Sequence, residues 1–127
     1  IGNPPMNFLN ATFDGEELKV GNLVIKTTKQ QKEMLVGHPE VVVGIRPESI
    51  VLHNDASVSK THQLLEIGCE FRELLGHEVV IYTHVEGQKL LVKVSSLEPV
   101  KAGDTLTIAI NPEALYFFDK NTTNRIR

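Results

Sequence analysis

The sequence predicts a mainly β domain, most simply a barrel of about eight short strands with one short helix. Two observations support this class. Apolar and polar residues alternate along most of the chain, and short turns that contain glycine separate the alternating runs. With 127 residues and a 41% hydrophobic composition, the chain can bury a self-supporting core. We therefore expect one domain, or two small intertwined sub-barrels.

The N-terminal third predicts short strands joined by tight turns. Asp14-Gly15 is a turn signal that follows the first alternating run. Residues 28–35 are dominated by good helix formers, and Gly37 and Pro39 would end that helix. The continuous apolar run at 41–45 predicts a strand buried on both faces. In chain order we expect strands at 7–13, 18–20 and 23–25, the helix at 28–35, and a strand at 41–45.

The rest of the chain predicts further strands around a hairpin. Glu86-Gly87-Gln88 is a good turn between two alternating runs, and residues 54–61 are polar enough to form a loop. One half-buried strand is expected to direct Leu65, Ile67, Cys69 and Phe71 toward the same side. The later strands are expected at 79–85, 89–94, 105–110 and 115–118.

The corner at Gly44-Ile45-Arg46-Pro47-Glu48 has a clear local explanation. Pro47 disfavours a helical conformation at Arg46, so the strand should end there. Pro47 also suits the first position of a helical turn, and Glu48 complements the dipole of that turn. We expect a local pair between Arg46 and Glu48, with a partner contact as a secondary role.

No motif of the sequence predicts catalysis. The phosphate-binding pattern G-x-x-x-x-G-K-[ST] does not occur. Glu73 and Glu78 could approach each other across a tight hairpin, but two solvated charges are the more frequent arrangement. Cys69 falls on the apolar phase of its strand and is expected in the core. The five histidines lack zinc-ligand spacing and are expected at the surface or at strand ends: His38, His53, His62, His77 and His84.

Charge and composition limit the classes of partner. The net charge is −3 and the 13 basic residues are scattered, which argues against a surface that follows nucleic-acid phosphates. No apolar run approaches the roughly 20 residues that cross a bilayer. A single cysteine cannot form an internal disulfide, which suits a reducing cytoplasm.

Four landmarks in order resemble one known family, the ATP-binding subunits of carbohydrate-import ABC transporters of the maltose, multiple-sugar and glycerol-3-phosphate types. Residues 1–9 (IGNPPMNFL) are similar to the junction that follows the nucleotide-binding domain in that family. Residues 44–48 (GIRPE), 73–78 (ELLGHE) and 118–119 (FD) match three further strings in the expected order. The resemblance spans essentially the whole chain.

The resemblance implies a C-terminal regulatory domain with a transport-associated OB fold. Residues 1–9 would be the junction from a missing nucleotide-binding domain, and residues 10–127 the regulatory OB-like domain. ATP and magnesium would bind in the missing domain, so no catalytic, cofactor or metal site is expected here. The parent protein would be a cytoplasmic ATPase on the inner face of the membrane. It would pair with a second copy of itself, associate with membrane subunits, and in some relatives bind a regulatory protein.

Two residue sets are the candidates for function under this interpretation. The expected interface or regulatory residues are Arg46, Glu48, Glu73, Gly76, His77 and Glu78. The expected hinge to the ATPase domain consists of Pro4, Pro5, Met6, Asn7 and Phe8. Two other functions remain open: a barrel that senses a solute or an oxyanion, and, ranked lower, a free-standing OB module that binds single-stranded nucleic acid.

Overall fold

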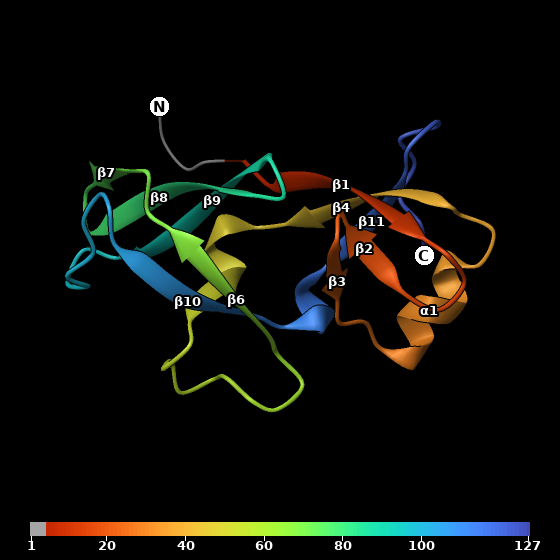
Figure 1. Cartoon of the computed structure of the whole chain (residues 1–127), viewed down its shortest axis with the longest axis horizontal. Helices are drawn as coiled ribbons and strands as arrows, with labels where there is room; N and C mark the ends of the chain where they lie inside the picture. Colours follow the sequence, from red (N-terminus) through yellow and green to blue (C-terminus); the bar gives the residue numbers. More distant parts are fainter. Residues whose placement is uncertain (1–4) are drawn as a thin grey trace.

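The computed structural model describes residues 5–127, and over this range the chain forms three antiparallel sheets (Figure 1). The helical elements are α1 (Lys29–Leu35) and the 3-10 turns η1 (Pro47–Ser49) and η2 (Pro112–Ala114). The strands are β1 (Asn7–Phe13), β2 (Leu18–Val20), β3 (Leu23–Ile25), β4 (Glu40–Ile45), β5 (Ile50–Leu52), β6 (Gln63–Gly68), β7 (Phe71–Leu75), β8 (Glu78–Val85), β9 (Gln88–Ser95), β10 (Thr105–Ile110) and β11 (Tyr116–Asp119). The predicted mainly β fold with one short α-helix is confirmed.

The first sheet has the strand order β11-β4-β1-β2-β3. Buried and exposed residues alternate strictly along β1, from exposed Phe8 and buried Leu9 to buried Phe13, because one face of the strand is covered. The predicted turn after β1 is present. Oδ1 of Asp14 accepts hydrogen bonds from the backbone N–H groups of Glu16 and Glu17 at 2.9 and 2.8 Å, which holds the reversal of the chain into β2.

Helix α1 begins with a reciprocal cap. The Gln31 N–H donates to Oγ1 of Thr28 at 3.1 Å, and the Thr28 N–H donates to Oε1 of Gln31 at 2.9 Å. The Gln31 side chain also donates to the carbonyl oxygen of Pro112 at 2.7 Å. Leu35 is fully buried. A helix of seven residues is too short to be stable alone, so α1 is stabilised by its cap and by packing against the rest of the fold.

The second sheet, β5-β10-β6, and the third, β7-β8-β9, complete the fold. They meet where β6 contacts β8 and where β5 contacts β9. The hairpin predicted between β8 and β9 is confirmed. Glu86 and Gly87 have φ values of 49° and 77°, as in the mirror-image turns whose twist fits a two-residue hairpin.

The single strand predicted through Leu65, Ile67, Cys69 and Phe71 is wrong. It is two strands, β6 and β7, separated at Cys69 and Glu70. Cys69 leaves its strand to exchange backbone hydrogen bonds of 2.8 Å with the loop at residues 103 and 104. It stays buried, as predicted, but the alternation is reset, and Phe71 is 57% exposed instead of facing the core.

Eleven strands are present among the described residues, more than the eight or so expected. Two of the additional strands arise from the break before β7 and from β5, which directly follows the helical turn predicted at Pro47. The strand expected to be buried on both faces, β4, is buried except for Glu40 at its start and the half-buried Val42. The predicted loop at 54–61 contains no helix or strand.

Buried side chains from all three sheets form one hydrophobic cluster. Its fully buried members include Leu18 of the first sheet, Ile108 of the second and Ile81 of the third. The first and third sheets also meet along β1 and β9. Within residues 5–127, no helix is long and apolar enough to cross a membrane.

Candidate interaction site

The hairpin of β7 and β8 carries four of the six predicted interface residues, Glu73, Gly76, His77 and Glu78. Gly76 has φ +62°, a conformation that L side chains rarely adopt, so the tip favours glycine. The Ser96 N–H donates to the carbonyl oxygen of His77 at 2.8 Å. The tip is therefore tied to the chain that leaves β9, and its side chains are presented on a supported turn.

Glu73 and Glu78 have separate partners rather than each other. The hydroxyl of Tyr82 donates to Oε1 of Glu73 at 3.0 Å, and this hydrogen bond is the main reason that the pKa of Tyr82 is raised. The Lys93 ammonium lies 3.2 Å from Oε1 of Glu78. The two carboxylates therefore lack the shared environment of an acid–base pair.

The other two predicted residues, Arg46 and Glu48, lie where β4 passes into η1. The expected turn is confirmed, because η1 begins immediately after Arg46. The expected ion pair is not formed among the described residues. The guanidinium of Arg46 lies 5.4 Å from the centre of the Tyr116 ring, and that of Arg125 lies 4.7 Å from the same ring. An aromatic ring within about 6 Å attracts a guanidinium, so Tyr116 is the partner of Arg46 in place of the expected Glu48.

The six predicted residues thus form two groups, one at η1 and one at the β7–β8 turn. Strand β9 connects them, because it pairs with β8 and contacts η1. Within the described part of the chain, no hydrogen bond or ion pair joins the two groups directly. Their role at an interface stays a prediction.

The last two of the five predicted hinge residues belong to a regular strand. Pro4 lies outside the described residues, and Pro5 is exposed. Asn7 and Phe8 belong to β1, where Asn7 is buried. Met6 is half-buried beside Gly44, since a Cβ added to Gly44 would lie 2.6 Å from the sulfur of Met6. Met6 and Asn7 are therefore anchored to the domain. The assignment of the hinge itself stays a prediction.

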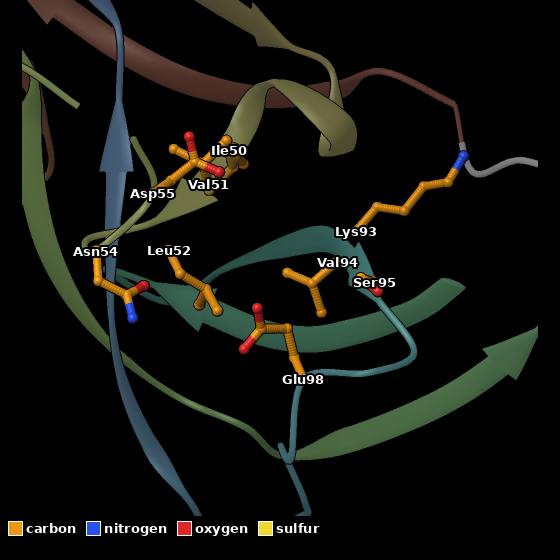
Figure 2. A pocket seen from close by; sticks show the side chains of 9 residues that line it. All are labelled: Ile50, Val51, Leu52, Asn54, Asp55, Lys93, Val94, Ser95 and Glu98. Carbon is orange, nitrogen blue, oxygen red and sulfur yellow. The ribbon is translucent and has the colours of Figure 1, made fainter. Parts of the chain in front are cut away.

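A cavity of about 320 Å³ lies between β5 and β9 (Figure 2). Asp55 and Glu98 place carboxylates at opposite sides of it, and the Lys93 side chain extends away from it. Local hydrogen bonds from Ser57 lower the pKa of Asp55, so that carboxylate is ionised at neutral pH. The charge inside is therefore negative, which opposes binding of an oxyanion at this position.

The remaining histidine, cysteine and acidic side chains do not gather at one site among the described residues. Among the described residues, no group of three or more histidine, cysteine or acidic side chains has a geometry for a metal ion. His38 lies 3.1 Å from a carboxylate oxygen of Asp119, and His84 lies 2.9 Å from Glu70. Burial raises the pKa of the Cys69 thiol, which makes it a poor nucleophile.

Sequence reasoning missed two exposed aromatic clusters. Phe8 and Phe118 pack edge to face at 5.7 Å on the first sheet, next to Tyr116, and Phe71 lies 5.3 Å from Tyr82 on the third. Only Phe13 and Phe117 of the seven aromatic residues are buried. Phe8 occupies an exposed position in the alternating pattern of β1, and this position could have indicated from the sequence that its ring lies at the surface.

Two family models match the chain in sequence order. A MalK OB fold domain matches residues 2–50, and a TOBE domain matches residues 43–118, which is more than half of the chain. The chain belongs to the TOBE domain family. The resemblance drawn from the four motifs is thereby confirmed at the level of the domain, and the matched models are those of OB and TOBE domains rather than of an ATPase domain.

Several import ATP-binding proteins are similar to this TOBE domain over its whole length. The oligosaccharides import ATP-binding protein MsmX of Bacillus subtilis is 31% identical over 100% of this chain. The sn-glycerol-3-phosphate import ATP-binding protein UgpC of Cupriavidus metallidurans is 30% identical over 99% of it. The aligned regions cover 36% and 35% of those proteins, so the chain spans about a third of their length.

A solved structure shows the same fold. The cytoplasmic molybdate-binding protein ModG, in a crystal form with molybdate bound, superposes with a TM-score of 0.63 at 15% sequence identity. The match covers 92% of this TOBE domain and 96% of the ModG chain. At this identity the likeness concerns the fold of the two proteins.

Proposed function

We propose that this TOBE domain is the non-catalytic C-terminal regulatory and dimerisation domain of the ATP-binding subunit of a carbohydrate-import ABC transporter. The parent subunit would work in the cytoplasm, on the inner face of the membrane. It would bind ATP and magnesium in its own nucleotide-binding domain and associate with the membrane subunits of the transporter. We infer no nucleic-acid partner, because the chain is acidic and its basic residues are scattered.

The likeness to import ATP-binding proteins over the whole chain carries this proposal. Those relatives are about three times as long as the chain, which leaves room for an ATPase domain outside the TOBE domain. The two family models, OB followed by TOBE, also match consecutive parts of the chain with no gap between them, at residues 2–50 and 43–118.

The domain would act mechanically. Two paired regulatory domains hold their ATPase domains near each other, so that closure on ATP becomes an intramolecular step with a high effective concentration. A protein that binds the regulatory domains better in the open state than in the closed state would inhibit transport by linkage. The β7–β8 turn and the η1 corner offer supported, exposed residues for such contacts.

The complete coding sequence that contains this chain tests the proposal. We expect an in-frame G-x-x-x-x-G-K-[ST] motif upstream, followed by an ABC signature motif. We expect that removing residues 5–127 from that full protein leaves the binding of ATP to the nucleotide-binding domain intact. The same deletion should reduce dimer formation and transport. An upstream region without an ATPase would overturn the proposal.

Sensing of a small solute is a second candidate, because the cavity beside β5 and β9 has the size of a small-ligand site. Its two carboxylates favour a neutral or cationic solute over an oxyanion. A ligand that binds only the folded state raises the melting temperature. A series of sugars and oxyanions compared by thermal unfolding, with Glu98→Gln as the control, distinguishes the two solute classes.

A further inference from the structure

The loop between β5 and β6 is polar and exposed, but it ends on a buried histidine. The loop spans residues 53–62, and its residues 53–61 are exposed except for the half-buried Val58. His62, directly before β6, is only 7% exposed, and it is one of four buried polar or charged side chains among the described residues. Buried polar groups are normally held by hydrogen bonds, so the contacts of His62 show how the loop is attached.

The ring of His62 accepts a hydrogen bond from the backbone of its own loop. The Ser59 N–H donates to Nδ1 of His62 at 3.0 Å, and Oγ of Ser59 lies 3.1 Å from the same nitrogen. The His62 N–H donates in return to the carbonyl oxygen of Ser59 at 3.1 Å. We use the name clasp for this reciprocal pair. Because a backbone N–H can only donate, Nδ1 carries a lone pair, and the proton of the neutral ring is on Nε2.

Lys26, which directly follows β3, holds the same end of the loop. Its ammonium donates to the carbonyl oxygen of His62 at 3.0 Å and to that of Lys60 at 3.5 Å. The backbone N–H of Lys26 donates to Oε1 of Gln63 at 2.8 Å. The clasp therefore lies beside a positive charge, and a proton on the His62 ring would add a second one.

The other charged groups near this end of the loop come from three elements. They line a cavity together with Lys26, and they are Lys60 of the loop, Lys32 of α1, and Glu16 and Glu17 of the turn between β1 and β2. Among the described residues, no carboxylate forms an ion pair or a hydrogen bond with the His62 ring. A proton taken up by this ring would therefore gain no carboxylate partner.

We propose that the clasp is an acid-sensitive switch, in which protonation of His62 releases the loop at residues 53–62. A proton at Nδ1 turns the acceptor of the clasp into a donor that faces the Ser59 N–H. The Ser59 hydroxyl can rotate and accept this proton, but the Ser59 N–H is fixed by the backbone and loses its partner. Histidine ordinarily changes its charge between about pH 5 and 8, so the loop is closed at the upper end of this range and opens as the pH falls.

The other titratable groups of the loop do not produce this response. Nδ1 of His53 lies 3.3 Å from the carbonyl oxygen of Thr107, which is an acceptor, so this nitrogen carries a proton in the neutral and the charged ring alike. Protonation of His53 therefore preserves its contact. Hydrogen bonds from the Ser57 side chain and backbone lower the pKa of Asp55, so that carboxylate stays ionised over the same range.

Release of the loop would reach the cavity between β5 and β9. Asn54 and Asp55 of the loop line one side of this cavity, and Glu98, which follows β9, lies at the other side (Figure 2). Acidification would therefore loosen one wall of the cavity while the other wall stays in place. The inference does not depend on the proposed function, because the loop and the clasp belong to this chain whatever its parent is.

Nuclear magnetic resonance of the ¹⁵N-labelled wild-type chain tests the clasp directly. We expect Nδ1 of His62 to carry no proton at about pH 7.5 and to gain one as the pH is lowered to about 5.5. The amide signal of Ser59 should shift along the same titration curve. A neutral ring with its proton on Nδ1 would overturn the inference, as would a ring that stays neutral down to about pH 5 or a Ser59 signal that does not follow the titration.

Cleavage after Lys60 by a lysine-specific protease measures the opening of the loop. His62→Asn is the test variant, because its side-chain oxygen can still accept the Ser59 N–H and does not titrate. We expect the ratio of the wild-type rate to the variant rate to rise about three- to tenfold from about pH 7.5 to about pH 5.5, as the loss of one hydrogen bond implies. The pH dependence of the protease itself cancels in this ratio.

His53→Asn is the matched control in the same loop, and it should keep the pH dependence of the wild-type chain. A ratio for His62→Asn that stays constant with pH would overturn the inference. A pH dependence that disappears in His53→Asn would assign the response to the other end of the loop and would also overturn it. The resonance experiment uses only the wild-type chain, so it decides the question even where a variant does not fold.

Discussion

Asn7 and Leu91 are joined by two hydrogen bonds across 84 positions of sequence. The side-chain amide of Asn7 donates to the carbonyl oxygen of Leu91 at 2.8 Å, and its Oδ1 accepts the Leu91 N–H at 2.8 Å. The amide thus occupies the place of a further strand residue beside β9. Gln88 repeats the arrangement with the backbone of Asn10, at 2.7 and 3.0 Å. Side chains therefore join the first sheet to the third.

Replacement of Asn7 should be costly. Asn7→Ala leaves the N–H and C=O groups of Leu91 without these partners in a part-buried position, at about 1–3 kcal/mol for each such group. We expect a loss of about 2–4 kcal/mol in the free energy of unfolding, measured by urea denaturation. Asn10→Ala is the matched control, because the Asn10 side chain is exposed, and it should change stability by less than about 0.5 kcal/mol. Equal effects of the two changes would contradict the role of the amide.

Gly44 should not tolerate a methyl group. A Cβ at this position would lie 2.6 Å from the sulfur of Met6 and 3.0 Å from Cε2 of Phe118. We expect Gly44→Ala to destabilise the fold by about 1–3 kcal/mol through overpacking, and Met6→Ala in the same chain to recover part of that loss. Gly68→Ala, which meets nothing within 4 Å, is the control. An additive double mutant would show that Met6 is not the obstacle.

Asp119 should make stability sensitive to acid. Hydrogen bonding from the Thr122 backbone, followed by the His38 side chain, lowers the pKa of Asp119 below its ordinary value of 3.8. The ionised form is favoured by folding, so this stabilisation is present above about pH 4 and is lost as the pH falls through the folded pKa. Asp119→Asn should lose less stability than the wild type between pH 6 and pH 3. Identical pH profiles in urea denaturation would refute this.

Thr123 should be a site where substitution stabilises the fold. Its φ is +63°, a conformation that a β-branched residue adopts at a cost of about 1–2 kcal/mol. We expect Thr123→Asn, which tolerates this region, to raise the free energy of unfolding by about 0.5–1 kcal/mol in thermal and urea denaturation. Thr122→Val is the control, because it removes the hydroxyl that accepts the Asn124 N–H at 3.2 Å, and it should lower the free energy of unfolding. No gain at Thr123 would mean that the turn is relaxed.

Much of the fold was predictable because its signals are local. Turn residues such as Asp14 and Gly87, and the helix formers at 28–35 that end before Gly37, act within a few positions, so they can be recognised in sequence. The break at Cys69 could not be predicted this way. Its cause is a pair of backbone hydrogen bonds with residues 103 and 104, which alternation within the strand does not report.

The candidate site was predictable only in part for the same reason. The η1 corner followed from Pro47, but the aromatic partner of Arg46 comes from β11, about 70 positions away. The contact between Glu70 and His84 becomes visible only in the folded chain, because His84 lies on β8, 14 positions from Glu70. Local patterns therefore identify exposed turns, while register decides which side chains those turns face.

The amide bridges between β1 and β9 also determine when the chain can finish folding. A ribosome that adds about 5–20 residues per second needs roughly 4–17 seconds to move from Asn7 to Leu91. Until then the start of β1 lacks the groups that its amide binds, and these distant contacts raise the contact order and slow the final step. Strand β1, the earliest strand of this domain, is therefore among the last of its strands to be fully hydrogen-bonded, and folding of the domain depends on the completion of its third sheet.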